Sequence, residues 1–405
     1  MSVLSSRPRH STGIADDLMK LLEPLALGSR TLRNRVFMAP LVRARSDAHR
    51  APTDLVDIYY AQRAGAGLIV TEGCHISLQS TTRANASAQH TDIQTQAWDR
   101  VVRKVHEAGG IIFQQLYHVG RKALLSTMPH GELPVAPSAI EAIGGVVTPE
   151  GLEKFPVPRA LETHEIPAIV ADFRAAFRRA AQAGFDGVEV LAANGFLIDQ
   201  FLRDETNLRT DAYGGSVQNR ARFLFEVVDA AIEELGAARV GVRISPHFRS
   251  DRIGDSDPVG TFSYVAAELD RRGIAYLHML EGTTHDSDPF LPLYLRLAKK
   301  PSATSGGPGP LPGDPFLAPI LRPLFKGVLV LNGGYTRATA EQVLSQGLAD
   351  AIAFGRLYIS NPDLPERFRQ DAALTEADPS TYYSGGPRGY IDYPTLCEQA
   401  AAAAA

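Results

Sequence analysis

The chain has 405 residues, of which 44% are hydrophobic, and its 41 basic and 45 acidic side chains give a net charge of −4 at pH 7. Because no basic block is present, this balance argues against nucleic acid or an anionic membrane surface as a partner. Two cysteines, Cys74 and Cys397, are too few for a disulfide framework or a structural zinc site, so no metal site is expected. No apolar run approaches the ~20 residues that span a bilayer, and the polar first twenty residues are unlike a secretory signal, which favours a cytoplasmic location.

Eight short apolar runs, each followed by a polar or glycine-rich turn and most by a helical stretch, organise the chain. Strands that alternate with helices indicate a parallel sheet, and eight such units close into an α/β fold, the (β/α)8 TIM barrel. We therefore expect a flexible leader over residues 1–20, a single barrel domain over 21–395 and a low-complexity tail over 396–405. The runs are Val36–Ala39, Leu68–Val70, Ile111–Phe113, Val188–Val190, Val240–Val242, Tyr276–Met279, Val328–Val330 and Ala351–Phe354.

The clearest helix precedes the fourth run, and two insertions interrupt the alternation. Apolar residues between Ile166 and Ala180 recur at three- and four-residue steps, which predicts one core-facing stripe. Residues 122–160, after the third strand, contain an alternating segment that predicts a hairpin cap. Residues 282–318, after the sixth strand, are interrupted by glycines and prolines and indicate a long flexible loop. Because chemistry in such barrels lies at the carboxyl ends of the strands, this loop is either a substrate lid or an unstructured insertion.

The loops after the seventh and eighth strands have the composition of an anion-binding site. Gly333 and Gly334 follow one strand, and Gly355 and Arg356 follow the other. Glycines let backbone N–H groups approach an anion, a helix N-terminus favours negative charge, and an arginine adds a fixed cation. Since this barrel commonly binds phosphate in these two loops, the pattern favours a phosphate site over a pair of tight turns.

Two further strand ends carry polar groups that suit a heterocycle. Gln115, at the end of the third strand, offers a donor and an acceptor on one amide. Arg243, at the end of the fifth strand, would place a permanent charge at the barrel mouth, where it needs an anionic partner. That partner is either a flavin, which gains negative charge near N1 and its C2 oxygen on reduction, or an internal carboxylate, Glu72 or Glu189.

Motifs along nearly the whole chain resemble the old yellow enzymes, which are ene-reductases that depend on flavin mononucleotide (FMN). The resemblance implies an FMN-dependent oxidoreductase with NADPH or NADH as reductant. In the family cycle the nicotinamide reduces the flavin and departs, and an α,β-unsaturated carbonyl then takes hydride at its β-carbon. We expect a small-molecule substrate and a monomer or homodimer. The matching segments are Asn34–Leu41, Tyr59–Arg63, Gln115–Arg121, Arg209–Ser216 with Asn219 and Arg220, Phe354–Arg356, Asn361–Leu364 and Gly389–Pro394.

The resemblance also implies roles for individual residues. Tyr117 and Tyr383 would border the substrate space, and Asn194 would hydrogen-bond the substrate carbonyl oxygen. Val42 stands where the family usually has Thr or Cys beside the flavin N5 and C4 oxygen, and losing that hydrogen bond should lower the flavin potential. The residues that would line the flavin ring are Pro40, Gly73, Gln115 and Arg243, and those that would hold its phosphate are Gly333, Gly334, Gly355 and Arg356.

The chain departs from the family pattern where the substrate would be activated. The family segment after the fourth strand reads His-x-x-(His or Asn)-Gly-Tyr, in which the first and fourth residues bind the carbonyl and the tyrosine protonates the α-carbon. Here Leu191 replaces the histidine and cannot donate a hydrogen bond, and Phe196 replaces the tyrosine and has no proton to give. Three histidines are candidates for a replacement acid, although an isolated histidine is more often structural, and none is favoured. They are His118, His278 and His285.

These departures leave three hypotheses open. The leading one is reduction of an activated C=C bond in a dedicated substrate, fairly hydrophobic because Leu191 makes the pocket more apolar. The second is a redox-neutral isomerase or a desaturase on the same scaffold, since neither needs a proton at the α-carbon. A lowered flavin potential argues against the desaturase. The third is a catalytically weak flavin-binding protein.

Overall fold

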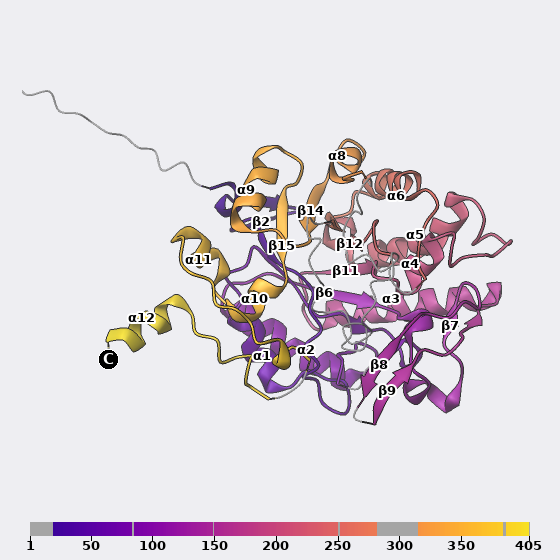
Figure 1. The fold of residues 1–405 in the computed structure, drawn as a ribbon, viewed down its shortest axis with the longest axis horizontal. Helices are drawn as coiled ribbons and strands as arrows, with labels where there is room; N and C mark the ends of the chain where they lie inside the picture. The colour runs from indigo at the N-terminus through magenta and orange to yellow at the C-terminus, as the bar shows by residue number, and fades with distance from the viewer. Residues whose placement is uncertain are drawn as a thin grey trace, which may run out of the picture.

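The computed structural model describes residues 19–82, 85–148, 150–249, 252–281, 315–383 and 386–404. Eight parallel strands close into a barrel with helices around the outside (Figure 1), which confirms the predicted (β/α)8 fold. Each predicted apolar run overlaps one strand, and the pairing of β11 with β6 completes the ring. In order around the ring, the strands are β3 (Val36–Met38), β4 (Leu68–Val70), β6 (Ile112–Tyr117), β11 (Gly187–Ala192), β12 (Val240–Ile244), β13 (Tyr276–Leu280), β14 (Val328–Asn332) and β15 (Ala351–Phe354).

The longer helices around the barrel each bury an apolar face. The predicted amphipathic helix is confirmed as α3 (Ile166–Gln182), with buried residues at three- and four-residue steps. Its neighbour α2 (Asp92–Glu107) begins with a capping box, in which Thr91 and Gln94 satisfy each other's backbone N–H groups. The remaining helices are α1 (Asp54–Ala61), α4 (Leu197–Leu202), α5 (Val217–Leu235), α6 (Pro258–Arg272), α8 (Ala318–Leu321), α9 (Arg337–Ser345), α10 (Arg356–Ser360), α11 (Leu364–Arg369) and α12 (Leu396–Ala404).

The barrel interior is built in layers, because alternate residues of a strand face the same side. On β6, Phe113 belongs to an apolar cluster with side chains from β3, β4, β13, β14 and β15. Gln115 lies two residues further on, and Tyr117 lies two residues beyond that, towards the carboxyl end of the strand. The apolar cluster therefore closes one end of the barrel, a polar layer lies above it, and Tyr117 marks the mouth.

Several short strands occur in addition to the eight strands of the barrel. The hairpin cap predicted after the third barrel strand is confirmed by the antiparallel pair β8 (Gly145–Thr148) and β9 (Gly151–Lys154). A second antiparallel hairpin, β1 (Leu25–Leu27) with β2 (Arg30–Leu32), was not predicted, and its buried leucines join the apolar interior cluster. The other short strands are β5 (Cys74–His75), which pairs with β6, and the parallel pair β7 (Val135–Ala136) and β10 (Arg159–Ala160).

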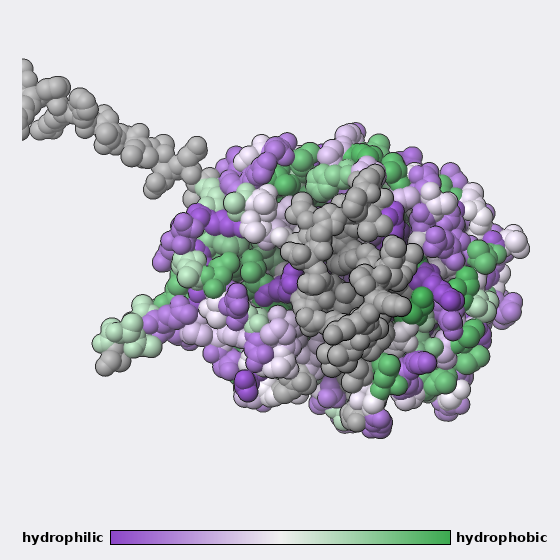
Figure 2. All heavy atoms as spheres, in the orientation of Figure 1, coloured by the Kyte–Doolittle hydropathy of each residue, from purple (hydrophilic) through white to green (hydrophobic). Residues whose placement is uncertain are grey.

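The predicted leader lies outside the described residues as far as residue 18, and so does most of the predicted loop, over 282–314. The predicted low-complexity tail forms α12, which projects from the body and buries none of its residues (Figure 1). On the face drawn in Figure 2, hydrophilic and hydrophobic residues alternate in small patches. Within the described ranges, no helix is long and apolar enough to cross a membrane.

Candidate active site

The polar layer of the barrel interior centres on the carboxylate of Glu189 in β11. This carboxylate accepts hydrogen bonds from the Gln115 amide nitrogen at 2.6 Å and from the Tyr276 hydroxyl at 3.0 Å. The third contact, at 2.8 Å, is with Nδ1 of His278. All four side chains are buried, so a carboxylate that would be costly alone is satisfied by side chains from two other barrel strands, β6 and β13.

Arg243 extends this network towards the phosphate loops. Its Nη1 lies 2.7 Å from His278 Nε2, and its Nη2 donates to the Asn332 side-chain oxygen at 2.8 Å. Because His278 Nδ1 faces Glu189, its Nε2 is left to accept from the arginine. Arg243 is therefore linked to Glu189 through His278. Of the two carboxylates considered from the sequence, Glu72 and Glu189, the network contains Glu189.

The pKa values of this network agree with that arrangement. Burial, and then the charge of Arg243, lower the pKa of His278 to about 4, so the imidazole is neutral at pH 7. Burial alone would raise the pKa of Glu189, but His278, Arg243 and Gln115 outweigh it and the pKa falls below its usual value. Burial lowers the pKa of Arg243, and the Glu189 charge opposes that shift.

The two glycine-bearing loops lie side by side, because β14 and β15 pair with Asn332 opposite Ala353. Gly333 and Gly334 have φ values of 129° and 72°, which favour glycine. A Cβ on Gly355 would lie 3.4 Å from its nearest neighbour, an ordinary contact, so the protein around it leaves space at this position. Arg356 follows directly and is exposed.

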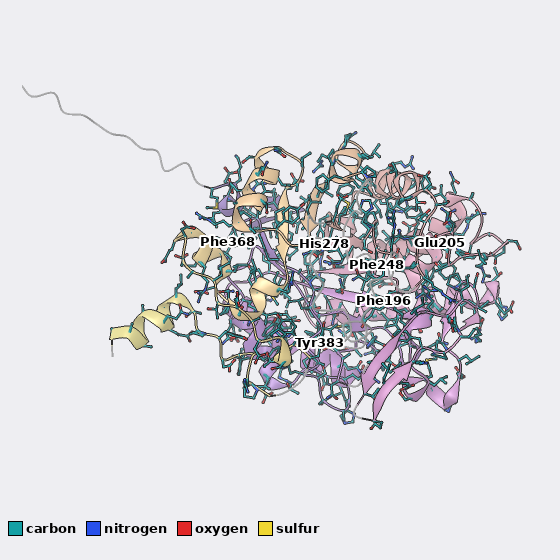
Figure 3. The ribbon with its side chains drawn as sticks, viewed as in Figure 1. Phe196, Glu205, Phe248, His278, Phe368 and Tyr383 are labelled. Atoms are coloured by element: carbon teal, nitrogen blue, oxygen red, sulfur yellow. The ribbon has the colours of Figure 1, made fainter. Side chains whose placement is uncertain are left out.

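The opposite wall of the mouth is apolar. Tyr117 and Leu191 are buried in one cluster, and the Phe196 ring packs against it with its centroid 4.9 Å from that of Tyr117. Tyr117 also stacks on His75 at a centroid distance of 4.8 Å. Phe196 and Phe248, labelled in Figure 3, come from the loops after β11 and β12. Three of the four predicted catalytic side chains therefore belong to, or pack against, one apolar cluster at the ends of the neighbouring strands β6 and β11. They are Tyr117, Leu191 and Phe196.

The fourth, Asn194, lies in a fixed turn between Leu191 and Phe196. Its backbone has φ 60°, its N–H donates to the Ser245 hydroxyl at 2.8 Å, and its carbonyl accepts from Lys122 Nζ at 3.0 Å. Lys122, at the end of the 3-10 helix Gly120–Lys122, was not predicted from the sequence. The signal available was a basic pair, Arg121 and Lys122, directly after the end of a strand on the catalytic side.

The other predicted residues are distributed around this mouth. Pro40 and Val42 are partly exposed on the segment after β3, and Gly73 is buried after β4. A Cβ on Gly73 would lie 2.8 Å from the Tyr117 ring and 3.1 Å from the Gln115 amide oxygen, so any larger residue would displace them. Tyr383 lines a surface pocket with Ala44–Ser46, Thr53–Leu55 and Asn85, and its role at the substrate space stays a prediction.

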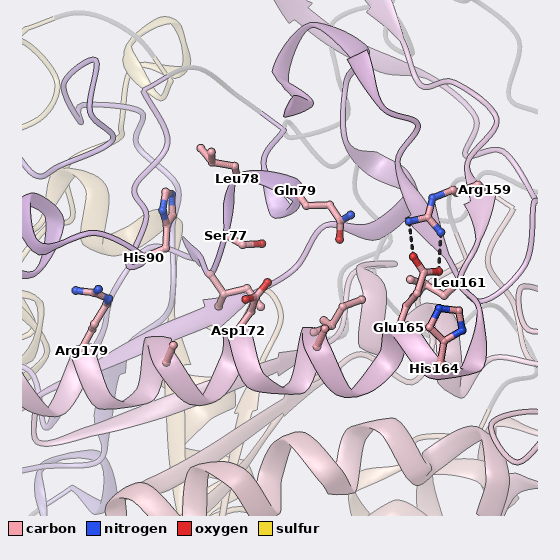
Figure 4. Close-up of a pocket in the computed structure, with 14 residues that line it drawn as sticks. Ser77, Leu78, Gln79, His90, Arg159, Leu161, His164, Glu165, Asp172 and Arg179 are labelled. Atoms are coloured by element: carbon pink, nitrogen blue, oxygen red, sulfur yellow. Dashed lines mark hydrogen bonds and ion pairs between the residues drawn. The ribbon is translucent and has the colours of Figure 1, made fainter. Parts of the chain in front are cut away.

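A larger pocket lies along α3 (Figure 4). It is lined by Ser77–Gln79, His90 and Asp172, and the ion pair between Arg159 and Glu165 borders one end. It shares no lining residue with the polar layer or the apolar cluster at the mouth. We therefore place the candidate active site at the strand ends and not in this groove.

Comparison with known proteins decides the family. A family model described as NADH:flavin oxidoreductase / NADH oxidase matches residues 20–375. The chain belongs to this family. A putative 12-oxophytodienoate reductase 11 from Oryza sativa subsp. japonica is 40% identical over 380 residues, 93% of this chain and 97% of the relative. A probable FMN-dependent alkene reductase from Leishmania infantum is 39% identical over 381 residues, covering 93% and 97%.

Solved structures place it among the old yellow enzymes. Morphinone reductase superposes with a TM-score of 0.84 at 45% identity over 94% of this chain and 97% of the other. The old yellow enzyme homologue from Zymomonas mobilis superposes with a TM-score of 0.85 at 42% identity over 93% and 100%. The protein is therefore an FMN-dependent oxidoreductase of the old yellow enzyme type, as the sequence predicted.

The mouth of this old yellow enzyme fits the cofactor of its family. Arg243 Nε is buried and has no hydrogen-bond partner among the described residues, so one donor of a permanent cation remains to be satisfied. The Gln115 amide nitrogen is committed to Glu189, which leaves its oxygen as an acceptor beside Gly73. Two adjacent glycine loops with an exposed arginine suit a phosphate. The donors, the acceptor and the loops are therefore compatible with a flavin ring and its phosphate.

Two histidines considered as replacement acids are poor proton donors. Burial lowers the pKa of His118 to about 3, and His278 is neutral within the Glu189 network. Neither imidazole carries a proton to spare at pH 7. His285 lies outside the described residues.

The buried His118 predicts a pH dependence of stability. Its Nδ1 accepts from the Gly120 N–H at 3.0 Å, a contact that His118→Asn would preserve without a titrating group. Because the folded-state pKa is about 3 against about 6.5 in the unfolded chain, the stability present above pH 6.5 is lost as the pH falls towards 3. From pH 6.5 to 5.5 the wild-type free energy of unfolding should fall by about 1 kcal/mol more than that of His118→Asn. Urea titrations at the two pH values measure this, and parallel changes in both proteins would contradict it.

Proposed function

We propose that the protein reduces the activated C=C bond of a dedicated, fairly hydrophobic α,β-unsaturated carbonyl compound, with NADPH or NADH as reductant. The observation that carries the proposal is the contrast between the two sides of the mouth. The cofactor side keeps a full polar set around Arg243 and Gln115, whereas Leu191 and Phe196 form an apolar wall on the substrate side. A site that holds a hydride donor beneath an apolar wall suits an apolar alkene.

The residues would divide the work as follows. FMN, when bound, supplies the hydride. Arg243 would bind the edge of the ring where negative charge accumulates, and Gln115 would orient the ring through its free amide oxygen. Tyr117, Leu191 and Phe196 would exclude water from the alkene. Asn194, held by the hydrogen bonds of its own backbone to Ser245 and Lys122, would bind the carbonyl oxygen.

A second candidate is supported by Phe196 itself. If no group protonated the α-carbon, an enolate would persist, and return of the hydride would leave an isomerised double bond. The desaturase is disfavoured by Val42, which offers no hydrogen bond to the flavin. A catalytically weak flavin-binding protein is disfavoured by the complete cofactor side. A cytoplasmic location and a monomeric or homodimeric state stay predictions.

The nicotinamide stoichiometry separates these candidates. The reconstituted holoenzyme is supplied with NADPH and a bulky enal, and both nicotinamide and products are quantified. Reduction requires one NADPH per saturated product, whereas isomerisation yields product with none consumed. Turnover without net oxidation of NADPH under anaerobic conditions would replace the proposed function with the isomerase.

A further inference from the structure

Lys122 places an ammonium group against the segment that carries the substrate-side substitutions. Its side chain is buried, with 8% of the residue exposed. Nζ lies 3.0 Å from the Asn194 carbonyl, 5.5 Å from the centroid of the Phe196 ring and 5.1 Å from that of Phe248. A Cβ on Gly195 would also lie 3.0 Å from Nζ. The ammonium therefore contacts the turn that precedes Phe196.

A buried ammonium group is unusual for a lysine. A lysine on a surface loop usually lays its stem on apolar surface and keeps its ammonium in water, because removing the charge from water is costly. Here the two aromatic faces and the Asn194 carbonyl compensate part of that cost, since a desolvated cation–π contact contributes up to about 2 kcal/mol. The fold thus maintains a charge at the mouth of an otherwise apolar wall.

The ammonium of Lys122 matters chemically because Phe196 stands where the family has a proton-donating tyrosine. A phenylalanine has no proton to donate, whereas an ammonium and a phenol are acids of nearly equal strength in water. The lysine stem is also flexible enough to bring Nζ from its position over the Phe196 ring into the adjoining substrate space. A group that can donate a proton is therefore present beside the ring that lacks one.

We propose that Lys122 is a catalytic residue that supplies the proton that Phe196 cannot, an inference that rests on the proposed reductase function. Hydride forms the new C–H bond at the β-carbon, and the electron pair of the alkene moves towards the carbonyl to give an enolate. The Lys122 N–H bond then breaks, its proton forms the C–H bond at the α-carbon, and the neutral amine regains a proton from water. Before that transfer, the ammonium stabilises the enolate charge.

Two substitutions separate the acid from the charge. Lys122→Met removes both, and Lys122→Arg keeps the cation but is a far weaker acid. The oxidative half-reaction of NADPH-reduced holoenzyme with cyclohexenone should slow about 10²-fold in both variants, while flavin reduction by NADPH stays within about twofold. Phe196→Tyr should restore the rate in the Lys122→Met background by about 10²-fold and change the wild type little.

A binding measurement tests the same residue without turnover. Cyclohexane-1,3-dione is an enolate at neutral pH and mimics the charged intermediate. Calorimetric titration into oxidised holoenzyme should give a dissociation constant about tenfold higher for Lys122→Met and nearly unchanged for Lys122→Arg.

The outcomes are distinguishable. If wild-type holoenzyme yields no saturated product, the proposed function and the role of Lys122 both fail. If the wild type reduces cyclohexenone and Lys122→Met does so at the same rate, only the role of Lys122 fails. A slowed Lys122→Met that Phe196→Tyr does not rescue, with unaltered binding of the dione, would leave the lysine a structural residue and overturn the inference.

Discussion

Arg243→Met should lower the free energy of unfolding of the apoprotein by about 3 to 5 kcal/mol and abolish FMN binding. The substitution removes the cation that balances Glu189, and the carboxylate then remains buried without it. Breaking one side of a buried charged network has a cost of this order, because the other side is left uncompensated. The bound cofactor would also lose Arg243 Nε, a buried donor that has no partner among the described residues.

The matched control is Arg356→Met. Arg356 is exposed, so its loss should change apoprotein stability by no more than about 0.5 kcal/mol while still weakening FMN binding through the phosphate. Urea unfolding of the apoprotein and the quenching of FMN fluorescence provide both readouts. Equal apoprotein stability in the wild type and Arg243→Met would show that the network does not depend on the arginine.

Leu191→His should accelerate hydride transfer to cyclohexenone by about 10²- to 10³-fold. Leu191 is buried two residues beyond Glu189 on β11 and faces the mouth, so an imidazole there would add a hydrogen-bond donor for the developing oxyanion. The wild type would offer the carbonyl oxygen Asn194 and the Lys122 charge. A second donor contributes most where water is excluded, as in the cluster with Tyr117.

Leu191→Met is the control for shape, since it keeps an apolar side chain of similar volume and should leave the rate within about twofold. Stopped-flow oxidation of the reduced holoenzyme gives the rate for each variant. A histidine variant no faster than the methionine variant would mean that the carbonyl of the substrate does not approach position 191.

The barrel could be predicted because its strands are short, apolar runs buried on both sides, and this pattern is visible locally. Each strand of the hairpin β1–β2 has three residues, and two of the three in β1 are buried. An alternating hydrophobic pattern cannot be recognised over so few residues, so the hairpin was missed. The pairs β7–β10 and β5–β6 involve two residues per strand, and such pairings depend on tertiary proximity.

The site could be predicted in part for the same reason. Strand-end residues such as Gln115 and Arg243 occupy positions that the barrel topology fixes, so their convergence follows from the fold. The contact of Lys122 with Asn194 joins residues 72 positions apart and has no local pattern. The neutral His278 between Arg243 and Glu189 was likewise hidden, because the choice of salt bridge depends on side-chain geometry inside the barrel.

The most direct test is an anaerobic single turnover. FMN holoenzyme is reduced with NADPH, freed of excess nicotinamide and mixed with cyclohexenone and then with larger enals, while the flavin spectrum and the products are followed. We expect the reduced-flavin spectrum to disappear and saturated product to form in equal amount, faster with the more hydrophobic enals. A flavin that stays reduced with every enone, with isomerised product or no product at all, would contradict a reductase.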